Sequence, residues 1–262
     1  MPTIKINNAD LYYELHGSGH PVVLIAGFAC DHLFWLPIFD QLSKHFQLLL
    51  IDNRGVGLTI DNEATLSIEL CAKDVINLCK ELGLERPHIV GQSMGGAIAQ
   101  TIAAQFPDKV SKVAILTSCA KLRRAVLLAF NSMLQMRKNN IDFDTIFSCM
   151  LPWIYGENFL SRQKNIDSLK KAFLDNPNPQ SLANQARQCQ LLESFDGRAQ
   201  LSKILAPTLV VHGLQDVVSL VMESQFMVER IPQARLVELD CAHGIVMEVP
   251  SELSRVLIEF LS

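Results

Sequence analysis

The pentapeptide Gly91-Gln92-Ser93-Met94-Gly95 constrains the fold more than any other stretch of this chain. A short apolar run, His88–Val90, precedes it, and the Ala- and Gly-rich segment Met94–Phe106 follows it. This order predicts a strand, a tight turn with Ser93 at its tip, and a helix that begins at once. The flanking glycines avoid the side-chain collisions that so sharp a turn would otherwise force.

Strand-like and helical patterns alternate through the first half of the chain. The apolar residues of Ser67–Leu82 repeat with a helical period, and Gly83 is typical of the position after a helix end. The expected strands are an N-terminal hairpin, Thr3–Asn7 with Asp10–His16, the wholly apolar run Pro21–Ala26, the similar run Phe46–Ile51, and Val110–Leu116. Such alternation predicts a parallel sheet with helices on both faces.

A helical segment interrupts this alternation between Cys119 and Gln200. Apolar residues recur at helical spacing from Leu122 to Leu134, and breaks are expected at Pro152-Trp153 and across residues 176–179. The alternation then returns, with expected elements at Pro207–Val211, Ser219–Arg230, Arg235–Leu239 and from Pro250 onward. We therefore expect a core formed by residues 1–118 and 201–262, with residues 119–200 inserted as a helical cap.

Two later positions supply the partners that a nucleophilic serine needs. A serine hydroxyl is a poor nucleophile without a base, which an acid must orient. Asp216 follows the strand Pro207–Val211, and His243 follows the strand Arg235–Leu239. Ligands of open parallel sheets bind at the carboxyl ends of the strands, where these residues and Ser93 are expected to emerge. We predict Ser93 as nucleophile, His243 as base and Asp216 as acid.

Each assignment also has an ordinary structural interpretation. Ser93 could be incidental in a glycine-rich turn, Asp216 could cap the helix expected at Ser219, and His243 could be a surface histidine. The agreement of all three in chain order and placement favours the catalytic interpretation. Asp240 is too close to His243 in sequence to replace Asp216 comfortably. The five histidines of the first half would break the expected order.

An oxyanion hole requires two backbone donors near the serine. One is expected at the N–H of Met94, the residue after the nucleophile. The other is expected in the loop after Pro21–Ala26, at the N–H of Phe28. Phe28 could instead be a wall of the substrate pocket, which would not exclude the first role.

Composition excludes several other classes of function. A formal net charge of −4 gives no reason to expect nucleic-acid binding. The seven cysteines lack metal-ligand spacing, so no metal is expected, and reduced thiols in a cytoplasmic protein are the simplest interpretation. Neither a phosphate-binding nor a dinucleotide-binding glycine motif occurs, so no cofactor is indicated. We expect neither a signal peptide nor a membrane segment.

Taken together, these motifs resemble the α/β-hydrolase superfamily over nearly the whole chain outside the cap. The matching segments are Gly27-Phe28 with Trp35, Asp52-x-Arg54-Gly55-x-Gly57-x-Thr59, Gly91–Gly95, Gly213-x-x-Asp216, and Ala242-His243 with Glu248 and Pro250. The resemblance implies an α/β-hydrolase fold, a mostly parallel sheet flanked by helices with an inserted helical cap. Two positions depart from the family pattern. Ala26 replaces a common histidine, which would loosen the oxyanion loop, and Thr59 replaces a common serine.

The chain is most similar to small cytoplasmic esterases, 3-oxoadipate enol-lactonases and pimeloyl-acyl-carrier-protein methyl ester esterases. The serine at the turn separates it from the dehalogenases and epoxide hydrolases of the superfamily, which carry aspartate there. The shared motifs do not distinguish among the three similar groups, because a fold does not fix a substrate.

The cap offers two weaker indications. Residues 119–200 carry 11 Lys/Arg and 7 Asp/Glu, and this basic surplus could steer an acidic substrate or an acidic acyl-carrier protein. A solvated helical surface explains the same charge. The aromatic residues Phe130, Phe147 and Trp153 could line an acyl pocket, although such residues more often pack a cap onto its core.

We therefore predict a serine hydrolase that cleaves a small or medium carboxylic ester through an acyl-enzyme, without a cofactor. Hydrolysis of an enol-lactone or a C–C bond by the same triad is the alternative within enzymes. A ligand-sensing protein that keeps the triad and turns over slowly is the alternative from another class.

Overall fold

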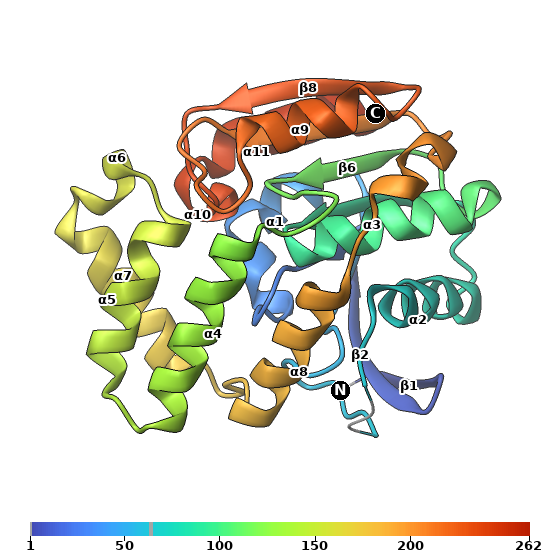
Figure 1. The fold of residues 1–262 in the computed structure, drawn as a ribbon. Coiled ribbons are helices and arrows are strands. Elements are labelled where there is room, and N and C mark those ends of the chain that lie inside the picture. The colour runs from blue at the N-terminus through green and yellow to red at the C-terminus, as the bar shows by residue number, and fades with distance from the viewer. Residues whose placement is uncertain (1, 63–64) are drawn as a thin grey trace.

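Helices cover both faces of a central sheet in the computed structural model, which describes residues 2–62 and 65–262 (Figure 1). The sheet has eight strands within this part of the chain, in the order β1-β2-β4-β3-β5-β6-β7-β8. Their bounds are β1 Thr3–Ile6, β2 Ala9–His16, β3 Pro21–Ile25, β4 Gln47–Ile51, β5 His88–Gln92, β6 Val113–Leu116, β7 Thr208–Gly213 and β8 Ala234–Leu239. Every strand expected from the sequence is present, within a few residues at its ends.

Pairing in the sheet gives six strands one common direction. β1 and β2 form the expected hairpin, with Ile6 opposite Ala9, and β2 also pairs antiparallel with β4. From β4 across to β8 every pairing is parallel. The carboxyl ends of β3 to β8 therefore lie along one edge of the sheet, which is where ligands of such sheets bind.

The central strands, β3 to β7, are buried on both faces, and this explains their mostly apolar sequences. Alternate residues of one strand enter different cores: Val23 and Ile25 face α2 (Ile68–Glu81) and α3 (Met94–Gln105), whereas Val22 and Leu24 face α1 (Leu36–Leu42) and α11 (Pro250–Leu261). Helix α9 (Val221–Val228) lies with the first layer, and the short α10 (Ile245–Glu248) lies with the second. Helix α1 was not predicted from the sequence.

Local signals explain where α2 begins and ends. The Ser67 hydroxyl accepts a hydrogen bond from the Leu70 N–H and so caps the first turn. Gly83, just past the C-terminus, adopts a φ of 67°, which glycine tolerates without strain.

Five helices are inserted between β6 and β7. They are α4 Arg124–Lys138, α5 Phe143–Ile154, α6 Glu157–Leu160, α7 Gln163–Asp175 and α8 Leu182–Ser194. In Figure 1 the green and yellow helices α4–α7 stand to the left of the sheet. The predicted break across 176–179 is confirmed, since it separates α7 from α8. The predicted break at Pro152-Trp153 is wrong, because α5 continues through Pro152 to Ile154.

Within the described residues, no helix combines the length and the apolar character that crossing a bilayer requires.

Candidate active site

Ser93 occupies the strained turn between β5 and α3. Its φ of 52° and ψ of −116° are unusual for a residue with a side chain. A Cβ on Gly91 would lie 2.1 Å from the Gly95 carbonyl oxygen, and one on Gly95 would lie 2.0 Å from that of Ile25. Only glycine fits these contacts, so the two glycines allow β5 and α3 to pack closely on either side of the turn. The Ser93 side chain stays partly exposed.

The structure brings Asp216 and His243 to this turn. His243 Nε2 lies 2.9 Å from Ser93 Oγ, and His243 Nδ1 lies 2.9 Å from Asp216 Oδ2. The Asp216 carboxylate is fully buried and accepts two further hydrogen bonds at Oδ1, from the N–H groups of Val218 and Ser219. One oxygen of Asp216 thus accepts the hydrogen bonds of a turn before α9, and the other faces the histidine. Serine, imidazole and carboxylate form one hydrogen-bonded chain.

Two residues beside the triad were not recognised from the sequence. Gln92 and Thr117 both donate to the carbonyl oxygen of His243, at 3.1 and 3.2 Å, and Gln92 also donates to the Thr117 hydroxyl. They lie at the carboxyl ends of β5 and β6 and are buried. They hold the backbone of the histidine loop against the nucleophile turn. Placement at a strand end was the available signal, but a glutamine or threonine there is not distinctive.

Two backbone N–H groups, those of Phe28 and Met94, were predicted to bind an oxyanion beside Ser93. A Cβ on Gly27 would lie 3.2 Å from Ser93 Cβ, so the loop after β3 approaches the nucleophile closely. In the described residues, no hydrogen bond occupies the N–H of Phe28 or of Met94. Met94 is the first residue of α3, where N–H groups lack partners within the helix and the positive end of the dipole faces an anion. Both amides therefore remain candidates for the oxyanion hole.

A narrow pocket of about 400 Å³, counting its open mouth, lies against Ser93 and His243. Its other walls are mostly apolar side chains and small hydroxyls, and no Lys, Arg, Asp or Glu lines it. They are Met94, Ala97, Thr117, Ser118, Cys119, Leu122, Phe130, Leu192, Phe195, Val218 and Ser219. Burial raises the pKa of the Cys119 thiol, which disfavours the thiolate and any competition with Ser93 as nucleophile.

Only one of the three predicted pocket aromatics lines this space. Phe130, on α4, lines it and stacks on Phe28 with ring centroids 5.3 Å apart. Phe147 instead packs between Phe143 and Phe173 inside the cap's own apolar cluster. Trp153 lies near the end of α5 and is likewise not among the lining residues. Helical periodicity identified apolar residues but did not show which faces meet the core.

The acid and histidine loops also contact the cap. Glu248 accepts hydrogen bonds from the N–H of Ala242 and from the N–H of the cap residue Gly156, and burial raises the pKa of its carboxyl. The Gly244 N–H donates to the Ile154 carbonyl at 2.7 Å. Glu248, noted in the sequence only as part of a family pattern, therefore links the residues around His243 to the cap.

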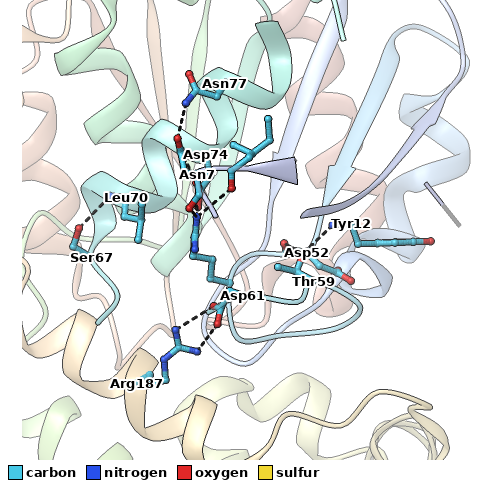
Figure 2. Close-up of polar contacts among 12 residues, drawn as sticks. Asn7, Tyr12, Asp52, Thr59, Asp61, Ser67, Leu70, Asp74, Asn77 and Arg187 are labelled. Carbon is cyan, nitrogen blue, oxygen red and sulfur yellow. Dashed lines mark hydrogen bonds and ion pairs between the residues drawn. The ribbon is translucent and has the colours of Figure 1, made fainter. Parts of the chain in front are cut away.

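Hydrogen bonds of Asp52 and Thr59 shape the segment after β4. Asp52 accepts from the N–H groups of His32 and Leu58, and its carbonyl accepts from the Thr59 hydroxyl. Thr59 in turn accepts from the Tyr12 N–H, as Figure 2 shows. A threonine hydroxyl therefore makes these turn contacts at the position where the family pattern has serine.

A buried ion pair fixes the same segment from the other side. The Arg54 guanidinium donates to both carboxylate oxygens of Asp74 on α2, at 2.6 and 2.9 Å. Asn7 donates to Asp74 as well, and the same region of Figure 2 contains the paired Arg187 and Asp61. This bidentate geometry makes the segment a rigid neighbour of the loop that carries Phe28.

Neither His212 nor Asp240, the other histidine and aspartate near the triad in sequence, lies where it could replace an assigned residue. His212 is buried in β7 with Nδ1 3.3 Å from the Ser224 hydroxyl, and burial lowers its pKa. Asp240 accepts hydrogen bonds from Gln215 and Asn158, away from the imidazole. Among the described residues, no group of three or more His, Cys, Asp or Glu side chains is arranged to hold a metal ion.

This chain belongs to the alpha/beta hydrolase fold family, whose model matches residues 20–250. It is 29% identical to "Putative carbamate hydrolase RutD" of Azorhizobium caulinodans, over 99% of this chain and 98% of that protein. A thermophilic esterase from Thermogutta terrifontis is 25% identical, with a TM-score of 0.85 over 99% of this chain and 96% of that one. The enol-lactonase from Burkholderia xenovorans LB400 has the same fold, with a TM-score of 0.88, 24% identity and 99% of each chain covered.

Proposed function

We propose that this protein is a serine hydrolase that cleaves a small or medium carboxylic ester. The hydrogen-bonded chain from Ser93 through His243 to Asp216, with both contacts at 2.9 Å, is the observation that carries the proposal. Nucleophile, base and acid in this order are the arrangement that activates a serine hydroxyl.

Each group has a defined step in the reaction. Ser93 Oγ attacks the ester carbonyl carbon as His243 Nε2 takes its proton, and Asp216 stabilises the resulting imidazolium. The Phe28 and Met94 amides bind the negative oxygen of the tetrahedral intermediate. Its collapse breaks the ester bond, and His243 gives its proton to the leaving alkoxide. Water, deprotonated by His243, then attacks the acyl-enzyme and releases the acid and Ser93.

The pocket supports a neutral substrate with a short acyl group. Its walls are mostly apolar, and no cationic side chain lines it that could pair with a second carboxylate. A buried carboxylate without a partner would be strongly disfavoured there. We expect kcat/KM to be highest for short neutral acyl esters and to fall when the acyl chain ends in a carboxylate.

Carbamate hydrolysis is the second candidate, because the relative that carries this name is 29% identical over nearly the whole chain. A carbamate presents the same carbonyl to Ser93 and the same developing oxyanion to Phe28 and Met94. Enol-lactones and C–C substrates remain alternatives for the same triad.

The test begins with covalent labelling. A fluorophosphonate should label Ser93 in the unmodified protein, and Ser93→Ala should abolish labelling and lower kcat by at least ~10⁴-fold. Ser132→Ala is the control, since Ser132 is exposed on α4 and lies outside both the triad and the pocket lining. Labelling that persists in Ser93→Ala would refute the assignment.

A substrate panel then separates the candidates. Short and long neutral esters, an ester with a terminal carboxylate, an enol-lactone and a carbamate ester should be compared by kcat/KM. Rapid multiple turnover of any of them excludes a ligand sensor. A carbamate that exceeds every ester would replace the first candidate by the second.

A further inference from the structure

We propose that Gln188, on cap helix α8, is a positioning residue for the oxyanion loop, residues 27–32. This inference rests on the proposed function, because it concerns the backbone that presents the Phe28 N–H. It assigns to the cap a part in the chemistry of the core.

The middle of the oxyanion loop is strained. Ala29 adopts a φ of 60°, a left-handed conformation that residues with a side chain rarely adopt. Such a conformation persists only where the surroundings hold it. The core holds the two ends of the loop: the Asn53 amide donates to the Ala26 carbonyl at 3.2 Å, and the Asp52 carboxylate accepts from the His32 N–H at 2.7 Å. Between these ends, the loop's own Cys30 N–H donates to the Gly27 carbonyl at 3.3 Å, and the contact from outside the loop comes from the cap.

Gln188 supplies this contact with a fully buried side chain. Its Oε1 accepts from the Ala29 N–H at 3.0 Å, and its Nε2 donates to the Arg54 carbonyl at 3.0 Å. One side chain therefore bridges the loops that follow β3 and β4. The Gln180 amide donates to the same Oε1, also at 3.0 Å. A buried amide bonded at both ends has little freedom to move.

The surroundings of α8 fix where Gln188 points. Arg187, the preceding residue, forms a bidentate ion pair with Asp61, both contacts being 3.1 Å, as Figure 2 shows. Gln180, just before the helix, also donates to the Gly55 carbonyl. These contacts attach the helix to the segment after β4, which the Arg54–Asp74 ion pair already holds rigid.

The bond to Ala29 affects the adjacent oxyanion donor. It fixes the peptide between Phe28 and Ala29, and with it the direction of the Phe28 N–H one peptide earlier. Phe28 is held from the cap a second time, by the stacking of its ring on Phe130. Because an oxyanion donor must meet the intermediate at hydrogen-bond distance, a shift of ~1 Å can cost ~10²-fold in rate.

The experiment compares Gln188→Met, Gln188→Glu and Gln180→Met. Gln188→Met keeps the length of the side chain but removes the bond to Ala29, whereas Gln188→Glu keeps an oxygen that can accept it. Gln180→Met removes a neighbouring amide and leaves that bond in place. For each variant, kcat and KM are measured with an activated short-chain ester. Binding is measured for a trifluoromethyl ketone, which forms an oxyanion on Ser93, and for the matched methyl ketone.

We expect Gln188→Met to lower kcat by about 10- to 100-fold with KM changed less than about threefold. Affinity for the trifluoromethyl ketone should fall by a similar factor, while affinity for the methyl ketone stays unchanged. Gln188→Glu should recover much of both losses. If Gln188→Met keeps the kcat and the trifluoromethyl ketone affinity of the unmodified protein, Gln188 has no positioning role.

Two measurements keep this result separate from other failures. Turnover that survives Ser93→Ala would refute the proposed function itself, whereas an inactive Ser93→Ala with a fully active Gln188→Met refutes only the role of Gln188. If Gln188→Met does not fold, hydrogen exchange of the Ala29 amide in the unmodified protein decides. Protection comparable to that of the α8 amides supports the bond, and exchange at the rate of an open loop overturns it.

Discussion

The core and the cap contribute to one site in different ways. The candidate triad stands on loops that follow β5, β7 and β8, and glycine contacts and backbone hydrogen bonds fix each residue. The cap lines the same space with side chains such as Phe130 and Phe195, and its Gln188 contacts the oxyanion loop. None of these residues belongs to a sequence motif. The chemistry therefore rests on the sheet edge, while the shape of the pocket and the hold on the oxyanion loop depend on how helices dock.

Removing the acid from the core should give the largest effect. Asp216→Asn keeps the size and the turn contacts but removes the charge that stabilises the imidazolium, so kcat should fall by at least ~10²-fold. Steady-state kinetics with an activated ester measure this, and Asp240→Asn is the matched control. A severe loss in Asp240→Asn with a nearly silent Asp216→Asn would show that the third member of the triad is misplaced.

Truncating aromatic side chains of the cap should give smaller effects, on catalysis for Phe130 and on stability for Phe147. Phe130→Ala opens the pocket wall and removes the stack on Phe28, so kcat/KM for a short ester should fall by roughly 10-fold.

Phe147→Ala is the comparison for that variant. It empties a site inside the cap cluster, so it should lower the free energy of unfolding by about 3–5 kcal/mol. The kcat/KM of the folded fraction should stay near that of the unmodified protein. Equal losses of kcat/KM in both variants would mean that the cap acts on catalysis as a whole and not through Phe130.

The same division explains what could be predicted from the sequence. Some features depend on residues that are neighbours in the sequence: the strands buried on both faces, the helix caps and the turn at Ser93. Their patterns therefore predicted the sheet and the placement of Asp216 and His243 at strand ends. Gln188 and Gln92 are ordinary polar residues whose partners lie far away in the chain. Phe147 and Phe130 share the same helical periodicity, and only the packing of α4 and α5 separates their roles. Pro152 lies in the last turns of α5 and does not end it there.

A pH experiment should distinguish the core attachment of the oxyanion loop from the cap attachment. His32 Nδ1 lies 2.8 Å from Asp52, and its Nε2 lies 3.6 Å from Glu14, whereas Gln188 carries no charge. Burial opposes protonation of His32 more than any single contact favours it. The hydrogen bond to Asp52 and the charges of Asp52, Glu14 and Asp31 together outweigh burial and raise the pKa above the ordinary value. A raised pKa in the folded protein means that the charged pair stabilises fully below the unfolded value of about 6.5. This stability is lost as pH rises through the folded pKa.

Thermal unfolding of the unmodified protein and of His32→Gln tests this. The difference in Tm between the two should be largest below pH ~6.5 and should shrink by a few degrees at higher pH. Gln188→Met, compared in the same way, should show no such dependence on pH in this range. A difference in Tm that is constant with pH for His32→Gln would mean that the charge on His32 does not hold the loop.

The basic surface of the cap should have the smallest effect. Lys121 pairs with Asp196 at 3.0 Å and Arg124 pairs with Glu193 at 2.8 Å, while Arg123 donates to the Val217 carbonyl. Exposed pairs of this kind contribute roughly 0–1 kcal/mol each and leave little electrostatic field to steer a ligand.

Changing Lys121, Arg123 and Arg124 together to Gln should therefore raise KM for an anionic or acyl-carrier-linked ester by no more than about threefold, and KM for a neutral ester should not change. Added salt should reproduce this small change in the unmodified protein, because exposed charges are screened beyond roughly 8 Å. A rise of tenfold or more, confined to the acidic substrates and abolished by salt, would instead make the cap a docking surface for an acidic partner and give its charge a part in recognition.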